Sequence, residues 1–278
     1  MTIRLVTDST CDLPQEIVRE HRITVIPLVI TAGDRELRDG IDITRSEFYA
    51  RLPEFRHSPK TAAPGPETFR QAYEGLAAEG ADEVLSIHIS HKLSATIDSA
   101  RQAAAETTAT QVTAFDSRQL SLGTGFEVLS AARAAAQGRP LPEIMDMLDG
   151  QIRRTHVCAA LDTLEYMRRG GRMSGAIAAL GTLLQVKPIL KMYDGEPTAE
   201  RVRTRLAALQ RLRALVAQNA PYEQAALLHS GALQAARDFH LLVEDSLPPG
   251  EIWMEEINPV LGAHIGPGVL GFAGVSRP

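Results

Sequence analysis

The sequence predicts a two-domain α/β protein, in which a Rossmann-like parallel sheet with helices on both faces precedes an α/β domain with a mixed sheet. A length of 278 residues is too great for one small core and suits two domains. A hydrophobic content of 44% and a charged content of 23% are typical of a soluble globular protein. Strand and helix patterns alternate through the first half, as they do in βαβ units. We place the boundary near residue 155, which gives expected domains of 1–155 and 156–278.

Short apolar strands alternate with helices in the first expected domain. The strands are predicted over 3–7, 24–31, 83–89 and 111–115. The helices are predicted after Asp12, after Thr44, and over 67–80, 97–107, 125–137 and 141–155. The segments 34–44 and 59–66 are expected to be loops, the second because its prolines disfavour regular structure.

Two of these helix starts carry capping signals. Thr44 followed by Glu47 is a capping box, in which each side chain accepts a hydrogen bond from the other residue's backbone N–H. Asp12 is the expected N-cap of the first helix, with Pro14 in its first turn and Gln15 at the capping-box position. Both signals predict where a helix begins.

The second expected domain begins with a strand over 157–161 and is densest in signals between 163 and 204. A short helix is expected to stop at Gly170-Gly171, because glycine accepts the left-handed backbone of a helix end. Asp194-Gly195 is a hairpin turn signal between two short strands. The remaining predictions are helices over 175–184, 201–218 and 232–244, strands over 224–229, 251–258 and 269–275, and a loop over 259–268.

Composition excludes several classes of protein. A net charge of −5, a pI near 5.9 and an aromatic content of 5% argue against a nucleic-acid binder. The most apolar segment, 176–186, is shorter than the roughly 20 residues that cross a bilayer, so we expect no stable membrane insertion. The start of the chain runs directly into a strand pattern without a signal peptide, which predicts a cytoplasmic protein. Cys11 and Cys158 are expected to be reduced thiols, and the histidines show no metal-ligand spacing.

Three predicted strands end in hydroxyl-rich turns, which are 8–10, 90–96 and 116–117. In an open parallel sheet, ligands bind beyond the carboxyl ends of the strands. Ser94 precedes a helix whose free N–H groups suit an anion, and Thr96 adds a second hydroxyl. For any one turn taken alone, capping of the next helix is the favoured interpretation. Three turns at one sheet edge predict a site that holds a carboxylate with neutral donors.

Thr61 and His264 are the other candidate donors. Thr61 lies in the loop before a predicted helix, and His264 lies in the glycine-rich segment 262–268. An imidazole can donate to a carboxylate and can carry charge near neutral pH. An acyl chain buried at roughly 0.8 kcal/mol per CH₂ would contribute on the order of 10 kcal/mol gross. Its apolar wall is expected from the small-residue helix 175–184 and its neighbours.

Motifs along nearly the whole chain resemble the DegV family, whose characterised members are bacterial fatty-acid-binding proteins. They are VTDST at the start, PKTAAP at 59–64, SHKLSAT at 90–96, FDSRQLSLGTG at 115–125, RRGGRMS at 168–174, KPILKMYDGEP at 187–197, ERVRT at 200–204 and GAHIGPG at 262–268. They occur in the family's order, so the joint match is more specific than any single motif.

The resemblance implies a carrier that is not itself an enzyme and uses no cofactor. Thr61, Ser94 and His264 match the residues that surround the carboxyl group of the bound long-chain fatty acid. Arg172, also expected near the ligand, and Arg203 match arginines linked to a protein partner. That partner is a dihydroxyacetone-kinase-like, ATP-dependent fatty acid kinase, to which the carrier presents the carboxylate for acyl-phosphate formation.

The chain departs from the family pattern at a few positions near these motifs. Ala95 stands where the family has glycine, and Ala62 and Ala63 replace two polar residues. Ile265 replaces a threonine after the histidine. The three expected carboxylate donors are retained, so these departures bear on the preferred acyl chain.

Two enzyme classes are the alternatives. A serine-type lipid or ester hydrolase would use Ser94 and His264 with Asp8 or Asp116, but no Gly-x-Ser-x-Gly elbow is present. A nucleotide enzyme would need a Walker loop or a dinucleotide fingerprint, and the glycine-rich segment 123–125 is neither. Labelling of Ser94 by a fluorophosphonate, or retention of ATP, would favour one of these classes over a carrier.

Overall fold

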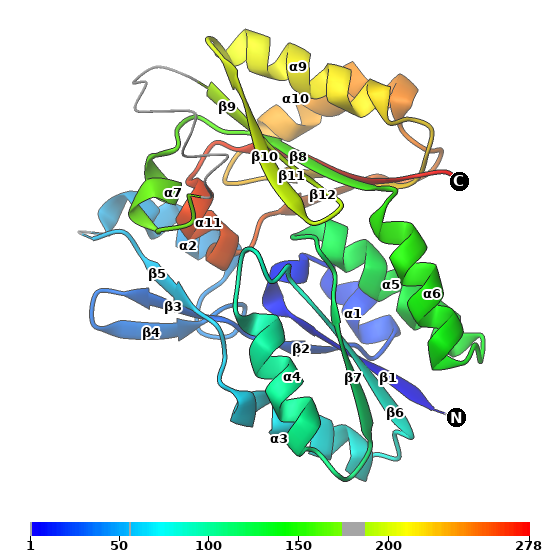
Figure 1. The fold of residues 1–278 in the computed structure, drawn as a ribbon. Helices are drawn as coiled ribbons and strands as arrows, with labels where there is room; N and C mark the ends of the chain where they lie inside the picture. The colour runs from blue at the N-terminus through cyan, green and yellow to red at the C-terminus, as the bar shows by residue number, and fades with distance from the viewer. Residues whose placement is uncertain (1, 56, 174–186) are drawn as a thin grey trace.

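The computed structural model of the chain describes residues 2–55, 57–173 and 187–278 (Figure 1). A parallel four-stranded sheet has the order β2-β1-β6-β7, and a six-stranded sheet has the order β10-β9-β8-β13-β11-β12. A smaller antiparallel sheet has the order β4-β3-β5. Their bounds are β1 Ile3–Asp8, β2 Thr24–Ile26, β3 Val29–Ala32, β4 Arg35–Arg38, β5 Lys60–Ala62, β6 Glu83–His88, β7 Gln111–Asp116, β8 Thr155–Ala160, β9 Lys187–Tyr193, β10 Glu196–Val202, β11 Tyr222–His229, β12 Trp253–Glu256 and β13 Leu270–Ser276.

Helices cover both faces of the parallel sheet, as predicted. Successive residues of a strand point to opposite faces. Val6 therefore packs in the cluster formed with α3 (Pro66–Ala78) and α4 (Thr96–Glu106). Leu5 points the other way, into the cluster formed with α5 (Leu122–Ala136) and α6 (Leu141–Ile152).

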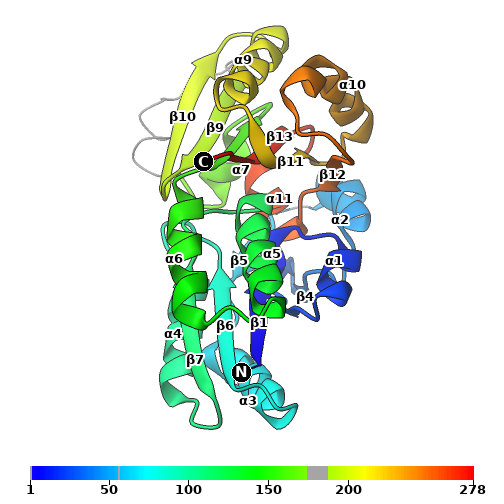
Figure 2. The ribbon, with the colours of Figure 1, turned by 90° about the vertical axis from the view of Figure 1, so that its right-hand side faces the viewer.

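The six-stranded sheet is mixed. The pair β11–β12 is parallel, and the other four pairs of neighbouring strands in this sheet are antiparallel. The helices α9 (Arg205–Gln218) and α10 (Leu233–Val243) cover one face of this sheet (Figure 1). They lie at the end of the molecule opposite α3 (Figure 2). The predicted α/β fold with one parallel and one mixed sheet is confirmed. No helix in the described ranges is both long enough and apolar enough to cross a membrane.

The small sheet was not anticipated. The predicted strand 24–31 is two strands in different sheets, because Pro27 between them lacks the N–H that a continuous ladder needs. The expected loop 34–44 contains β4, and the expected loop 59–66 contains β5. The strand β5 lies between Pro59 and Pro64, and its residues Lys60–Ala62 form a strand by pairing with β3.

One capping prediction is confirmed and the other is wrong. Thr44 and Glu47 form both bonds of the capping box at the start of α2 (Arg45–Arg51). Asp12 does not cap α1 (Gln15–Glu20), whose N-cap is Pro14, with no side-chain bond. Asp12 instead adopts a left-handed conformation, with φ 56° and ψ 14°, and its side chain is buried.

Two long helices of the prediction are too long because strands occupy their ends. The helix predicted over 141–155 ends at Ile152, before β8 begins at Thr155. The helix predicted over 201–218 begins at Arg205, since β10 runs through Val202 and Thr204 is the N-cap.

The glycine signals are confirmed, but one loop is a helix. Asp194-Gly195 forms the β9–β10 turn, with φ values of 46° and 78°. The helix α7 (Glu165–Arg169) ends where predicted, with Gly171 at φ 69°. The expected loop 259–268 contains α11 (Pro259–Ile265), which the side chain of Asn258 caps. The predicted helix 175–184 lies outside the described residues.

Candidate functional site

A cavity lies between the parallel sheet, the six-stranded sheet and α11. Its volume is about 140 Å³. Apolar side chains dominate its wall and come from elements far apart in the sequence. Examples are Leu28, Leu93, Leu120, Val157, Leu190 and Met192.

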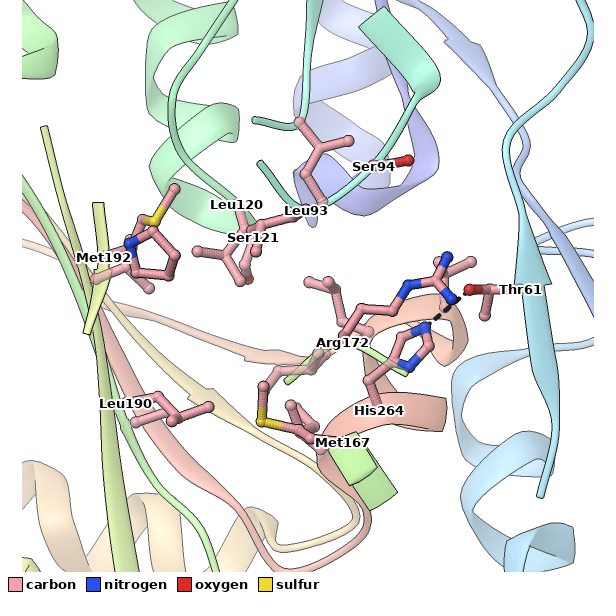
Figure 3. Close-up of a pocket in the computed structure, with 18 of the residues that line it drawn as sticks. Thr61, Leu93, Ser94, Leu120, Ser121, Met167, Arg172, Leu190, Met192 and His264 are labelled. Carbon is pink, nitrogen blue, oxygen red and sulfur yellow. Dashed lines mark hydrogen bonds between the residues drawn. The ribbon is translucent and has the colours of Figure 1, made fainter. Parts of the chain in front are cut away.

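The cavity has a polar side and an apolar side (Figure 3). Thr61, Arg172 and His264 lie together on one side, and Leu190 and Met192 lie on the opposite side. Such an arrangement suits an amphipathic molecule with one polar end, because the apolar part is buried against hydrocarbon while the polar end is hydrogen-bonded.

His264 and Thr61 are joined directly, although 203 positions separate them. The Nε2 atom of His264 lies 2.8 Å from Oγ1 of Thr61. His264 is carried by α11 and Thr61 by β5. Gly170, at the end of α7, packs against the imidazole so closely that a Cβ there would collide with Nδ1 of His264. The α11 helix that carries His264 is therefore in tight contact with α7 at Gly170.

His264 is neutral at pH 7. Burial lowers the pKa of its imidazole to about 4, and the positive charge of Arg172 adds to the effect. The charge that an imidazole can carry near neutral pH is therefore disfavoured for His264 in this environment. Its Nδ1 atom is buried and has no hydrogen-bond partner among the residues that the structure describes. Since Nε2 is bonded to Thr61 and Nδ1 packs against Gly170, the neutral imidazole orients the Thr61 hydroxyl at the cavity wall without adding a charge there.

Ser94 lines the cavity, and Thr96 supports it from behind. The two hydroxyl oxygens are 2.7 Å apart, and the backbone N–H of Thr96 also donates to Oγ of Ser94. Thr96 is fully buried and is not part of the cavity wall. Ala95 has φ −78°, which any residue adopts, so the loss of the family's glycine causes no strain there. Ala62 and Ala63 both line the cavity, so the polar groups that they replace are missing from the wall itself.

The two predicted partner-binding arginines lie in different surroundings. Arg172 lines the cavity, and its Nη1 atom donates to the carbonyl of Gly170 at 2.9 Å. Arg203 is exposed in the turn between β10 and α9 and does not line the cavity. Lys191, which the sequence did not single out, also lines it, but its Nζ lies 2.6 Å from Oε1 of Glu200, so its charge is paired.

The three hydroxyl-rich turns do meet at one edge of the parallel sheet, as predicted. Asp8 accepts from the backbone N–H of Ile89 at 3.1 Å, which joins the first turn to the second. Asp8 and Asp116 are bonded to His88 and His91 and do not line the cavity. Only the turn that carries Ser94 contributes to the cavity wall.

The geometry does not form the hydrolase triad. Ser94 bonds Thr96, and no hydrogen bond joins it to His264, although both residues are described. Asp8, His88 and Ser86 do form an acid–imidazole–hydroxyl chain. Nδ1 of His88 lies 2.9 Å from Oδ2 of Asp8, and Nε2 of His88 lies 2.6 Å from Oγ of Ser86. All three of its side chains are fully buried, which closes them to a substrate. Within the residues that the structure describes, no cluster of His, Cys, Asp and Glu could hold a metal.

Ser121 is a cavity residue that the sequence analysis missed. It has φ 52° and ψ −142°, a conformation that residues with a side chain rarely adopt. Its hydroxyl donates to Oδ2 of Asp12 at 2.5 Å. No local pattern marks this position, because its strain and its partner depend on a residue 109 positions away.

The sequence matches one family over almost its whole length. The family model described as "Uncharacterised protein, DegV family COG1307" matches residues 2–277. A DegV domain-containing protein of Streptomyces coelicolor is 36% identical over 281 residues, which cover 99% of each chain. A DegV domain-containing protein of Listeria innocua is 33% identical over 273 residues, which cover 97% of this chain and 96% of that protein.

Solved structures of this family superpose over the whole chain. A DegV family protein from Thermus thermophilus, described with fatty acid binding, is 37% identical with a TM-score of 0.88 and full coverage of both chains. DegV from Bacillus subtilis, described as a fatty acid binding protein, is 30% identical with a TM-score of 0.91 and full coverage of both chains. The similarity therefore includes both large sheets and the elements around the cavity.

Proposed function

This chain belongs to the DegV family, and on that premise we propose that it binds a long-chain fatty acid non-covalently in its cavity. The carboxylate would lie on the polar side, near Thr61, Ser94 and His264. The acyl chain would extend toward Leu190 and Met192 on the apolar side. The single observation that carries this proposal is the apolar cavity with a hydrogen-bonded His264–Thr61 pair at one side.

The energetics of the cavity favour such a ligand. Burying an acyl chain at roughly 0.8 kcal/mol per CH₂ supplies most of the affinity. The head group then needs only orientation, which the hydroxyls of Thr61 and Ser94 can provide. Since His264 is neutral, Thr61 and Ser94 would supply uncharged donors to the carboxylate, and the cation on this side of the cavity is the exposed Arg172. The relatives described as fatty-acid-binding proteins give independent support.

The protein is proposed to be a carrier subunit and not an enzyme. Its partner would be a dihydroxyacetone-kinase-like, ATP-dependent kinase that phosphorylates the bound carboxylate. Arg172 and Arg203 would contact that kinase, and enclosure of the acyl chain would limit hydrolysis of the reactive acyl phosphate. The two proposed domains, 1–155 and 156–278, would supply the carboxylate turns and the tail wall, and the protein would act in the cytoplasm without a cofactor.

Native mass spectrometry of the gently purified protein is expected to show added mass in the fatty-acid range. The reason is that a buried acyl chain dissociates slowly when it leaves an apolar cavity for water. The same protein after delipidation and re-exposure to palmitic acid should regain one ligand mass. A clean apo mass after that exposure would contradict the carrier function.

Arg172→Ala is expected to spare fatty-acid binding but to lower kinase-coupled acyl-phosphate formation about tenfold, as expected for loss of an interface arginine. Arg172 is exposed and has no carboxylate partner among the described residues, so its guanidinium is free to contact a partner. The matched control is Arg169→Ala, which removes an exposed arginine already paired with Glu165. Coupled turnover equal to that of the wild type would refute a docking role for Arg172.

A further inference from the structure

Asp12 is a buried carboxylate that joins three parts of the chain. It follows β1 in a left-handed conformation and is 1% exposed. Its Oδ2 atom accepts from the hydroxyl of Ser121 at 2.5 Å. Its Oδ1 atom accepts from the backbone and side-chain nitrogens of Asn258 at 2.9 and 3.1 Å. Arg45 supplies the counter-charge, with Nη2 3.3 Å from Oδ1.

The bond to Asn258 anchors the helix that carries His264. The Oδ1 atom of Asn258 accepts from the backbone N–H of Leu261 at 2.9 Å and so caps α11. This helix has seven residues, too few to be stable by itself, so its position depends on its contacts. Asn258 therefore connects Asp12 at one end to the helix that positions the imidazole at the other.

The bond to Ser121 anchors the opposite part of the cavity wall. Ser121 lines the cavity and immediately precedes α5. A strained backbone persists only where surrounding contacts determine it, and the short bond to Asp12 is such a contact. The same carboxylate thus reaches the loop at Ser121 and the start of α11.

We propose that Asp12 is a positioning residue of the binding site, which fixes α11 and the Ser121 loop relative to each other and thereby sets the selectivity for a carboxylate head group. This inference rests on the proposed function, because it concerns the same cavity. Asp12 itself does not line the cavity, so it acts through Asn258 and Ser121. A displacement of α11 would separate His264 from Thr61, and a donor cluster that is loosely held loses orientation.

The test compares two probes that differ only in their head group, palmitic acid and hexadecanol, in competition with a fluorescent lipid. In Asp12→Ala, affinity for the acid is expected to fall about tenfold more than affinity for the alcohol, since head-group geometry is lost while the tail wall remains. Asp12→Asn should restore most of the ratio. Its amide oxygen can still accept from Asn258, and the Ser121 hydroxyl can accept from its NH₂.

Leu76→Ala is the control for simple destabilisation, because Leu76 is buried on α3 beyond the parallel sheet and does not line the cavity. It should lower the melting temperature and leave the acid-to-alcohol ratio unchanged. If Asp12→Ala is too unstable to purify, Asn258→Ala removes the same link and should lower the ratio about threefold. An unchanged ratio in the folded variant, or an equal change in Leu76→Ala, would overturn the role of Asp12. Wild-type protein that binds neither probe would overturn the proposed function itself.

Discussion

Ala159→Trp is expected to lower fatty-acid affinity at least about a hundredfold while the protein remains folded. Ala159 lies on β8, between Leu190 of β9 and Gly271 of β13, and lines the cavity. An indole at this position would occupy the space proposed for the acyl chain. Displacing three or four methylene groups, at roughly 0.8 kcal/mol each, already amounts to about a hundredfold in affinity.

Displacement of a fluorescent lipid measures this affinity, and thermal unfolding reports on the fold. The filled cavity should not lower the melting temperature, because the new side chain replaces empty space with contacts. Ala105→Trp, an exposed position on α4, is the matched control and should bind like the wild type. Tight binding by a folded Ala159→Trp protein would show that the acyl chain does not enter this cavity.

The stability of the ligand-free protein is expected to fall by about 3 kcal/mol between pH 6.5 and 4 through His264 alone. Burial and Arg172 lower the pKa of His264 from 6.5 to about 4, which corresponds to that energy. The unfolded chain binds the proton more readily than the folded one across this range. Stability from His264 is therefore complete above about pH 6.5 and is lost as the pH falls toward 4.

His264→Gln isolates this contribution. Glutamine does not titrate, so the free energy of unfolding should depend less steeply on pH in the variant than in the wild type. Other buried groups also make the stability depend on pH: burial raises the pKa of Asp39 to about 7 and lowers that of His156. The difference between the two profiles removes these shared contributions. Parallel profiles for the wild type and His264→Gln would refute a depressed pKa of His264.

Local sequence signals were sufficient for most of the regular structure. The alternation of strands and helices, the Thr44–Glu47 capping box and the Asp194-Gly195 turn depend on residues within a few positions of one another. Hydrophobic periodicity and turn chemistry are therefore legible without a structure. The same signals failed where a strand pairs with a segment distant in the sequence. The strand β5 is an example, because it is a strand only through its pairing with β3.

The candidate donors could be named from the sequence, but their arrangement could not. Thr61, Ser94 and His264 were identified by motif, and the structure brings Thr61 and His264 to 2.8 Å across 203 positions. Thr96 was expected to bind the ligand, yet it lies behind Ser94, because burial of a side chain depends on what packs over it.

The sequence by itself determined the α/β class, the order of most elements and the types of residue available for a head group. Only the tertiary structure decided that His264 is neutral, that Ser121 is part of the cavity wall, and that Asp12 bonds Asn258 across 246 positions and does not cap α1. The physical reason is range. Propensities and caps act between near neighbours, whereas cavities, buried carboxylates and shifted pKa values arise from contacts between segments that the sequence keeps far apart.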